Sequence, residues 1–153
     1  MPPSSQDLAE ISSHIRYEIE MAFIIPKHNP KDGHIRESVF LSMLIHARIL
    51  LHFFESADRR QDDVLCSDFG FPTRAVNLAP EHRKRFNKDM MHLTYSRLRH
   101  TSETKPWPLQ DIMQPLLLRS LEFIEFVISH PPTHMKAEEL YQWKLLMKTF
   151  NKE

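Results

Sequence analysis

Glycine and cysteine are both scarce in this chain of 153 residues, which has 2 Gly against 11 Pro and a single Cys. Folds rich in β-sheet usually need more glycine in their turns, together with β-branched runs that are absent here. Cys66 stands alone, which excludes a disulfide framework and any zinc site built from cysteines. With only Gly33 and Gly70, the chain cannot form a glycine-rich phosphate-binding loop either.

The chain also lacks net charge and long apolar runs, since 20 Lys and Arg balance 20 Asp and Glu. A neutral chain is not a polycation that coats nucleic acid along its whole surface. His, Arg or Glu interrupts the longest apolar stretches, so we expect no transmembrane helix and no membrane partner. Residues 1–10 carry no basic residue and no apolar core of a signal peptide, which predicts a cytoplasmic location.

What the chain does have is helical periodicity. Its 41% hydrophobic and 26% charged residues are typical of one ordinary globular domain. Apolar residues recur at spacings of three and four, the period of an amphipathic α-helix. The pattern predicts an all-α, single-domain bundle of four to five helices over residues 1–153. The expected helices cover about 5–25, 35–56, 81–99, 109–129 and 137–149.

The second expected helix is apolar on nearly all sides, so we expect it to be central and covered by its neighbours. The connection that follows, 57–79, is long for a loop. It contains four large apolar residues, which predict that it folds back onto the bundle: Val64, Leu65, Phe69 and Phe71. It also contains an acidic patch, which is either solvated or paired with Arg48, Arg59 or Arg60: Asp58, Asp62, Asp63 and Asp68.

The third expected helix carries an ordered polar face. Arg85, His92 and Arg99 are seven residues apart and so share one stripe, flanked by Lys88 and Tyr95. Residues 81–100 hold six basic and two acidic residues, a local net charge of +4. An arginine presents a planar fork to phosphate oxygens, and a histidine can move a proton to or from a ribose 2′-hydroxyl. The alternative is a solvated basic face on a surface helix.

A second polar set lies on the apolar second helix, where Arg48, His52 and Glu55 follow spacings of four and three. Charged groups on a central helix need water or a partner, because burial alone is costly. Two interpretations stay open. Either Arg48 and Glu55 form an ion pair at the edge of the core with His52 beside it, or Arg48 and His52 line a cleft against the third helix.

Although the chain has 10 histidines, none of its expected helices carries two of them at the four-residue spacing that usually binds metal. His46 and His52 are six residues apart, about 120° around a helix, so they cannot share one ion. We therefore expect no metal and no cofactor, while a metal site assembled across helices stays open. Cys66 has no neighbour that would define a nucleophile, and we expect a partly buried structural thiol.

Two segments resemble a known superfamily. They are residues 37–54, with ESVFL and IHAR, and residues 83–95, with RKRFNK and HLTY. Together they are similar to small, uncharacterised bacterial helical proteins and, more distantly, to the HEPN superfamily of helical ribonucleases and nucleotide-binding domains. The superfamily signature is an Arg followed by a His after four to six residues, matched here by Arg85 and His92 with six between them. The residue directly after Arg85 is Phe86, whereas the superfamily often has a polar residue there.

The resemblance implies an RNA-directed domain that works as a homodimer and cleaves RNA without metal. Arg85 would hold the phosphate, and His92 would act on the 2′-hydroxyl or the leaving oxygen. Asn87, Tyr95 and Arg48 would assist, with Lys88, Arg99 and His52 as further binding residues. The alternatives are a non-catalytic module that binds nucleic acid or an acidic protein, and a regulatory dimer joined through the second or fourth helix.

Overall fold

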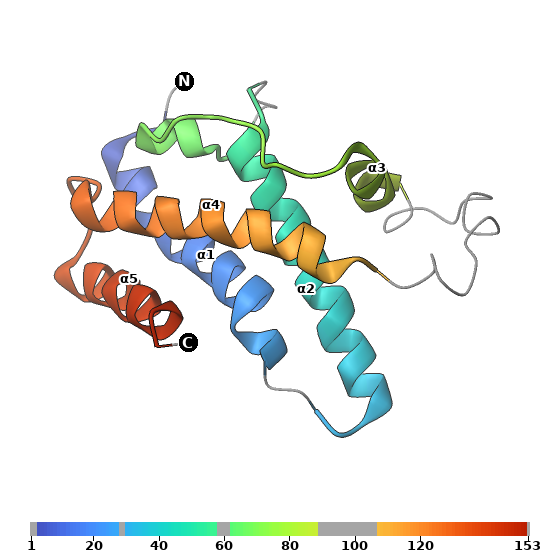
Figure 1. Cartoon of the computed structure of the whole chain (residues 1–153). Helices are drawn as coiled ribbons and strands as arrows, with labels where there is room; N and C mark the ends of the chain where they lie inside the picture. The colour runs from blue at the N-terminus through green and yellow to red at the C-terminus, as the bar shows by residue number, and fades with distance from the viewer. Residues whose placement is uncertain (1–2, 28–29, 58–61, 89–106, 153) are drawn as a thin grey trace.

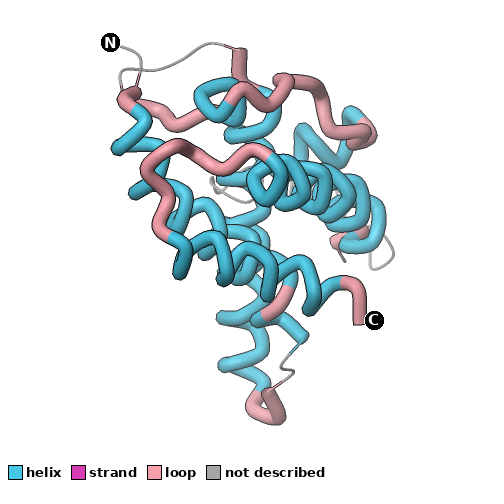
Figure 2. The backbone as a smooth tube through the Cα atoms, turned by 90° about the vertical axis from the view of Figure 1, so that its left-hand side faces the viewer, coloured by secondary structure: helices cyan, strands magenta, loops and turns pink. Residues whose placement is uncertain are grey.

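The computed structural model describes residues 3–27, 30–57, 62–88 and 107–152. In these ranges the chain forms α1 (Ser5–Phe23), α2 (Gly33–Glu55), α3 (Pro80–Lys88), α4 (Leu109–Ser129) and α5 (Ala137–Phe150). Two short 3₁₀ helices join them, η1 (Ile25–Lys27) and η2 (Cys66–Phe69). Helices account for 74% of the described residues and no strand occurs among them, as the tube in Figure 2 shows. This confirms the predicted all-α bundle.

The helix ends follow local capping chemistry. Ser4 and Asp7 form a capping box at the start of α1, with the Asp7 amide 3.1 Å from Ser4 Oγ and the Ser4 amide 2.8 Å from Asp7 Oδ2. Asp32 caps α2, which therefore begins at Gly33, two residues before the expected start at 35. Pro80 opens α3, a position where its missing N–H costs nothing. Helix α4 begins at Leu109, as expected, and runs through Pro115.

Helices α1 and α2 pack side by side along most of their length, and α4 crosses them (Figure 1). Helix α5 returns beside α4 and also contacts α1. Arg16 of α1 fastens this contact, since its Nε lies 3.0 Å from Glu139 Oε1 of α5 and its Nη1 2.7 Å from Glu20 Oε1. The hydrogen bonds that Arg16 donates to Glu139 raise the pKa of Arg16. The small α3 lies at the edge of the bundle, near the C-terminal half of α2.

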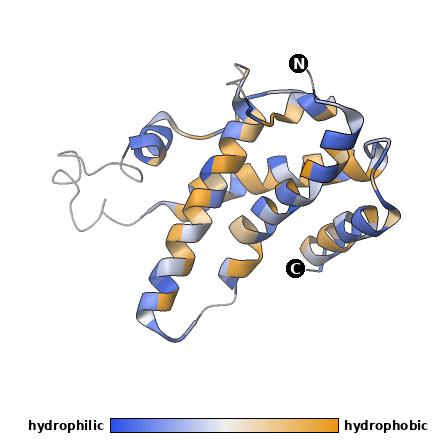
Figure 3. Ribbon diagram, turned by 180° about the vertical axis from the view of Figure 1, so that it is seen from behind, coloured by the Kyte–Doolittle hydropathy of each residue, from blue (hydrophilic) through white to orange (hydrophobic). Residues whose placement is uncertain are grey.

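The core is centred on an aromatic cluster around Phe123 of α4. Its ring packs edge-to-face against five others at centroid distances of 5.0 to 6.0 Å: Phe53, Phe54, Phe69, Phe71 and Trp143. Phe54, Phe123 and Trp143 are fully buried. Figure 3, coloured by hydropathy, shows apolar and polar stretches alternating along α1 and α4, whereas α3 is largely polar.

Helix α2 is covered less completely than its composition suggests. Seven of its residues are buried, from Met43 to Phe54, but four large apolar residues stay exposed on its outer face: Ile35, Leu41, Ile45 and Ile49. Among the described helices, α2 alone is long and apolar enough to span a membrane. A central helix of a globular bundle has the same properties, so the absence of a membrane partner stays a prediction.

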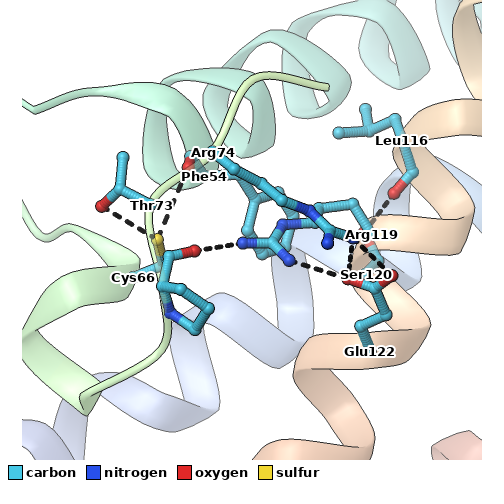
Figure 4. Close-up of polar contacts among 9 residues, drawn as sticks. Phe54, Cys66, Thr73, Arg74, Leu116, Arg119, Ser120 and Glu122 are labelled. Atoms are coloured by element: carbon cyan, nitrogen blue, oxygen red, sulfur yellow. Dashed lines mark hydrogen bonds and ion pairs between the residues drawn. The ribbon is translucent and has the colours of Figure 1, made fainter. Parts of the chain in front are cut away.

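The connection between α2 and α3 folds back onto the bundle, as predicted, and buries Leu65, Cys66, Phe71, Val76 and Leu78. Arg119 of α4 fixes it in place (Figure 4): this arginine, only 4% exposed, donates to the Pro72 carbonyl and lies 4.1 Å over the Phe71 ring. Arg119 Nη1 also lies 2.7 Å from Glu122 Oε2. The buried Cys66 Sγ donates to the Phe54 carbonyl at 3.5 Å.

Candidate functional site: a cleft between α2 and α3

A cleft of about 610 Å³ opens between the C-terminal half of α2 and helix α3. Cavities of this size are typical of small-molecule and substrate sites. Residues from three parts of the chain line it: Ile45, Arg48, Ile49, Leu51, His52, Glu55, Ser56, Asp63, Arg83, Phe86 and Asn87. The sequence left two arrangements open: an Arg48–Glu55 ion pair with His52 beside it, or a cleft lined by Arg48 and His52. The structure has the second arrangement, since both Arg48 and His52 line this cleft.

Glu55 is committed to the α2–α3 contact. Its carboxylate accepts two hydrogen bonds from the Arg83 guanidinium, one of them 2.9 Å from Nη2 to Oε1, and a third from the Val76 amide at 2.6 Å. The hydrogen bonds that Arg83 donates to Glu55 raise the pKa of Arg83. Because Arg83 occupies both carboxylate oxygens, the Arg48–Glu55 ion pair does not form.

His52 is held by the connection that precedes η2. Its Nε2 lies 3.0 Å from Asp63 Oδ2, while 48% of the histidine side chain stays exposed. The sequence placed Asp63 in an acidic patch but did not assign it to His52. The two residues are 11 apart and come from a helix and a loop, so no helical spacing relates them.

Arg48 is the remaining cation of the cleft. It is partly buried on α2, between the exposed apolar residues Ile45 and Ile49, and has no carboxylate partner among the described residues. The two acidic residues of the cleft, Glu55 and Asp63, are engaged by Arg83 and His52. Within the described part of the chain, Arg48 is therefore the guanidinium of the cleft without a carboxylate partner, beside an apolar wall, an arrangement that attracts an anion with an apolar portion.

Helix α3 divides its predicted site residues between two environments. Asn87 lines the cleft, and Lys88 is exposed at the end of the described helix. Arg85, by contrast, does not line the cleft: its guanidinium lies 4.4 Å from the centroid of the Trp107 ring, which itself packs edge-to-face on Phe86 at 5.9 Å. His92, Tyr95 and Arg99 lie outside the described residues, so the Arg85–His92 pair stays a prediction.

A second hollow of about 420 Å³ lies near the start of α1 and is acidic. Asp7, Glu10, Asp62 and Asp68 line it with His14, and Asp63 borders both hollows. Over the described ranges, no three His, Cys, Asp or Glu side chains are grouped so that they could hold a metal ion.

Asp7 of this hollow caps α1. The hydrogen bond that Ser4 donates to its carboxylate lowers the pKa of Asp7.

Cys66 is structural. Its side chain is fully buried, more than the partly buried thiol expected from the sequence, and burial raises its pKa. A buried thiol that stays protonated is a poor nucleophile.

Comparisons with known proteins add no assignment: no family model matches the chain, and neither a curated protein nor a solved structure matches it.

Proposed function

We propose that this protein is an RNA-directed, HEPN-like domain that binds a phosphate of single-stranded RNA in the cleft between α2 and α3. One observation carries the proposal: Arg48 lines that cleft without a carboxylate partner among the described residues. Keeping an arginine partly buried beside apolar residues costs stability unless an anion completes it. Asn87 on the opposite wall supplies a neutral hydrogen-bonding group, and Ile45, Ile49 and Phe86 supply apolar surface.

Binding of a labelled single-stranded RNA to an Arg48→Ala variant tests this proposal. We expect a dissociation constant raised by roughly tenfold, since a charge-assisted contact to phosphate contributes on the order of 1.5–3 kcal/mol. Arg36→Ala is the matched control, because Arg36 is exposed on the same helix and does not line the cleft. Equal affinities of the two variants would reject the cleft as the RNA site.

The finer proposal is a metal-independent endoribonuclease that uses the Arg85 and His92 of the superfamily motif. It requires RNA cleavage in the presence of EDTA that leaves cyclic phosphate ends and is lost in His92→Ala. RNA that is bound but left intact favours the alternative, a non-catalytic binding module. Binding by such a module weakens steeply with added salt and survives His92→Ala.

We also propose that the protein forms a homodimer through α2, because this helix has an exposed apolar face. Ile35 and Leu41 are 55% and 54% exposed, and Ile45 and Ile49 continue the same face. Light scattering of Leu41→Lys tests the interface, because a buried lysine would separate the protomers. Leu118→Lys on α4, at a residue that is 57% exposed, tests the fourth helix in the same way. A wild-type protein that is strictly monomeric rejects both.

A further inference from the structure

Helix α2 carries two histidines that are each held by a carboxylate, in contrasting environments. His46 Nδ1 lies 2.6 Å from Glu18 Oε2 of α1, its side chain is 14% exposed, and the Tyr17 ring packs edge-to-face on it at 5.6 Å. His52 Nε2 lies 3.0 Å from Asp63 Oδ2, but its side chain is 48% exposed and lines the cleft. Only the second histidine is therefore accessible to a ligand in the cleft.

The Asp63 contact determines which nitrogen of His52 is available for chemistry. A carboxylate accepts a hydrogen bond, so Nε2 carries the hydrogen and Nδ1 keeps its lone pair. A carboxylate in this position also orients the imidazole and stabilises an imidazolium that forms during a proton transfer. Asp63 therefore orients the His52 ring and leaves Nδ1 as the nitrogen that can accept a proton.

Arg48 lies one helical turn before His52, and both side chains line the same cleft. A phosphate held by Arg48 would place a neighbouring ribose close to the His52 ring. The remaining charged groups of the cleft, Glu55 and Arg83, are joined to each other. Of the charged or titratable side chains described in the cleft, His52 and Arg48 are therefore the ones left to act on a bound phosphodiester.

We infer that His52, in place of the His92 of the superfamily motif, is the proton-transfer residue for RNA cleavage in this cleft and that Asp63 is its positioning residue, an inference that rests on the proposed RNA-directed function. Nδ1 takes the proton of the ribose 2′-hydroxyl as the 2′ oxygen forms its bond to phosphorus. The bond from phosphorus to the 5′ oxygen then breaks, and the imidazolium returns the proton to that leaving oxygen. The products are a 2′,3′-cyclic phosphate and a 5′-hydroxyl end. The reaction as written needs no metal or other co-reactant.

The test is single-turnover cleavage of an end-labelled, single-stranded RNA in EDTA, measured together with RNA affinity. We expect His52→Asn to slow cleavage roughly 100-fold or more, the usual contribution of a general base, and to leave the dissociation constant within about threefold. His46→Asn is the matched control, since it removes a carboxylate-held histidine of the same helix that does not line the cleft. Circular dichroism confirms that each variant is folded at the assay temperature.

Asp63 is tested by a pair of substitutions. Asp63→Asn keeps the shape of the side chain but loses the charge that stabilises the imidazolium, so we expect cleavage to slow by about tenfold or more. Asp63→Glu restores the carboxylate and should recover part of the rate. A merely structural role for Asp63 predicts the opposite order, because Asn is closer in size to Asp than Glu is.

The outcomes separate this inference from the proposed function. Cleavage by His52→Asn at the wild-type rate overturns the role of His52, whatever His92→Ala does. Wild-type protein that binds RNA in the cleft without cleaving it also overturns that role, but leaves RNA binding in place. Wild-type protein that binds no RNA overturns the proposed function and this inference with it.

Discussion

The Glu55 carboxylate and the Arg83 guanidinium join the end of α2 to α3 through two hydrogen bonds, and Glu55 also accepts the Val76 amide. The Glu55 side chain is 16% exposed and that of Arg83 34%. This contact therefore fixes one wall of the cleft relative to the other and holds the connection between the two helices.

Glu55→Gln should lower the free energy of unfolding by about 2 kcal/mol, because it removes a partly buried charge-assisted pair and leaves Arg83 without its counter-charge. Urea denaturation followed by circular dichroism measures the change. Glu37→Gln, on an exposed position of the same helix, should change the value by less than about 0.5 kcal/mol. Equal stabilities of the two variants would contradict the role assigned to Glu55.

Arg48→Met should leave stability unchanged or raise it, by up to about 1 kcal/mol. The arginine has no carboxylate partner among the described residues and adjoins Ile45 and Ile49, so an apolar side chain of similar length loses no ion pair and avoids desolvating a charge. Thermal denaturation checks this expectation. A loss of 2 kcal/mol or more would show that Arg48 serves the fold rather than a ligand.

Phe123→Ala should cost about 3–5 kcal/mol, the usual result of removing a fully buried aromatic ring. Phe123 contacts five other rings, so the cavity it leaves cannot close without moving α2, α5 and the connection together. Leu118→Ala, at an exposed position of the same helix, is the control and should change stability by less than about 0.5 kcal/mol. Chemical denaturation of both variants provides the measurement.

Glu122 should make the stability depend on pH. Burial raises its pKa, but hydrogen bonds from Arg119 and Arg74 outweigh that effect and lower the pKa below its ordinary value of 4.5. A carboxyl whose pKa is lowered by folding stabilises the protein above the unfolded pKa, and this contribution is lost as the pH falls through the lower folded value. Since the Glu122 side chain is 45% exposed, solvent screening limits the contribution to about 1 kcal/mol.

Glu122→Gln should accordingly be less stable than the wild type at pH 7, with the difference closing as the pH falls below 4. Thermal melts at several pH values measure this. A difference that stays constant from pH 7 to pH 2.5 would mean that the charge of Glu122 contributes nothing to the fold.

The helices and most of the core could be predicted from the sequence because both follow short-range rules. The signals are local. Ser4 caps α1, Pro80 opens α3, and helical spacing brings three buried residues of α4 to one face: Leu116, Phe123 and Val127. The start of α2 was two residues late in the prediction because the cap at Asp32 was not recognised. The prediction that the connection between α2 and α3 folds back onto the bundle came from the apolar residues of the connection itself.

The polar contacts could not be predicted in this way, because their partners are far apart in the chain. Glu55 and Arg83 are separated by 28 residues, His52 and Asp63 by 11, and Arg119 and Pro72 by 47. Helical spacing left open whether Glu55 pairs with Arg48, and nothing predicted that Arg119, within an apolar helix, would be buried against a carbonyl and the Phe71 ring. Arg85 was expected to face a phosphate, and it stacks on Trp107.

Periodicity and capping act within a few residues of the chain, so the all-α class and the approximate extents of the helices could be read from the amino-acid pattern, as far as the described residues reach. Which charges neutralise one another, and which charge is left over, depends on how the helices pack. The packing of α3 and the connection against α2 gives Glu55 to Arg83 and Asp63 to His52, and it leaves Arg48 facing the cleft.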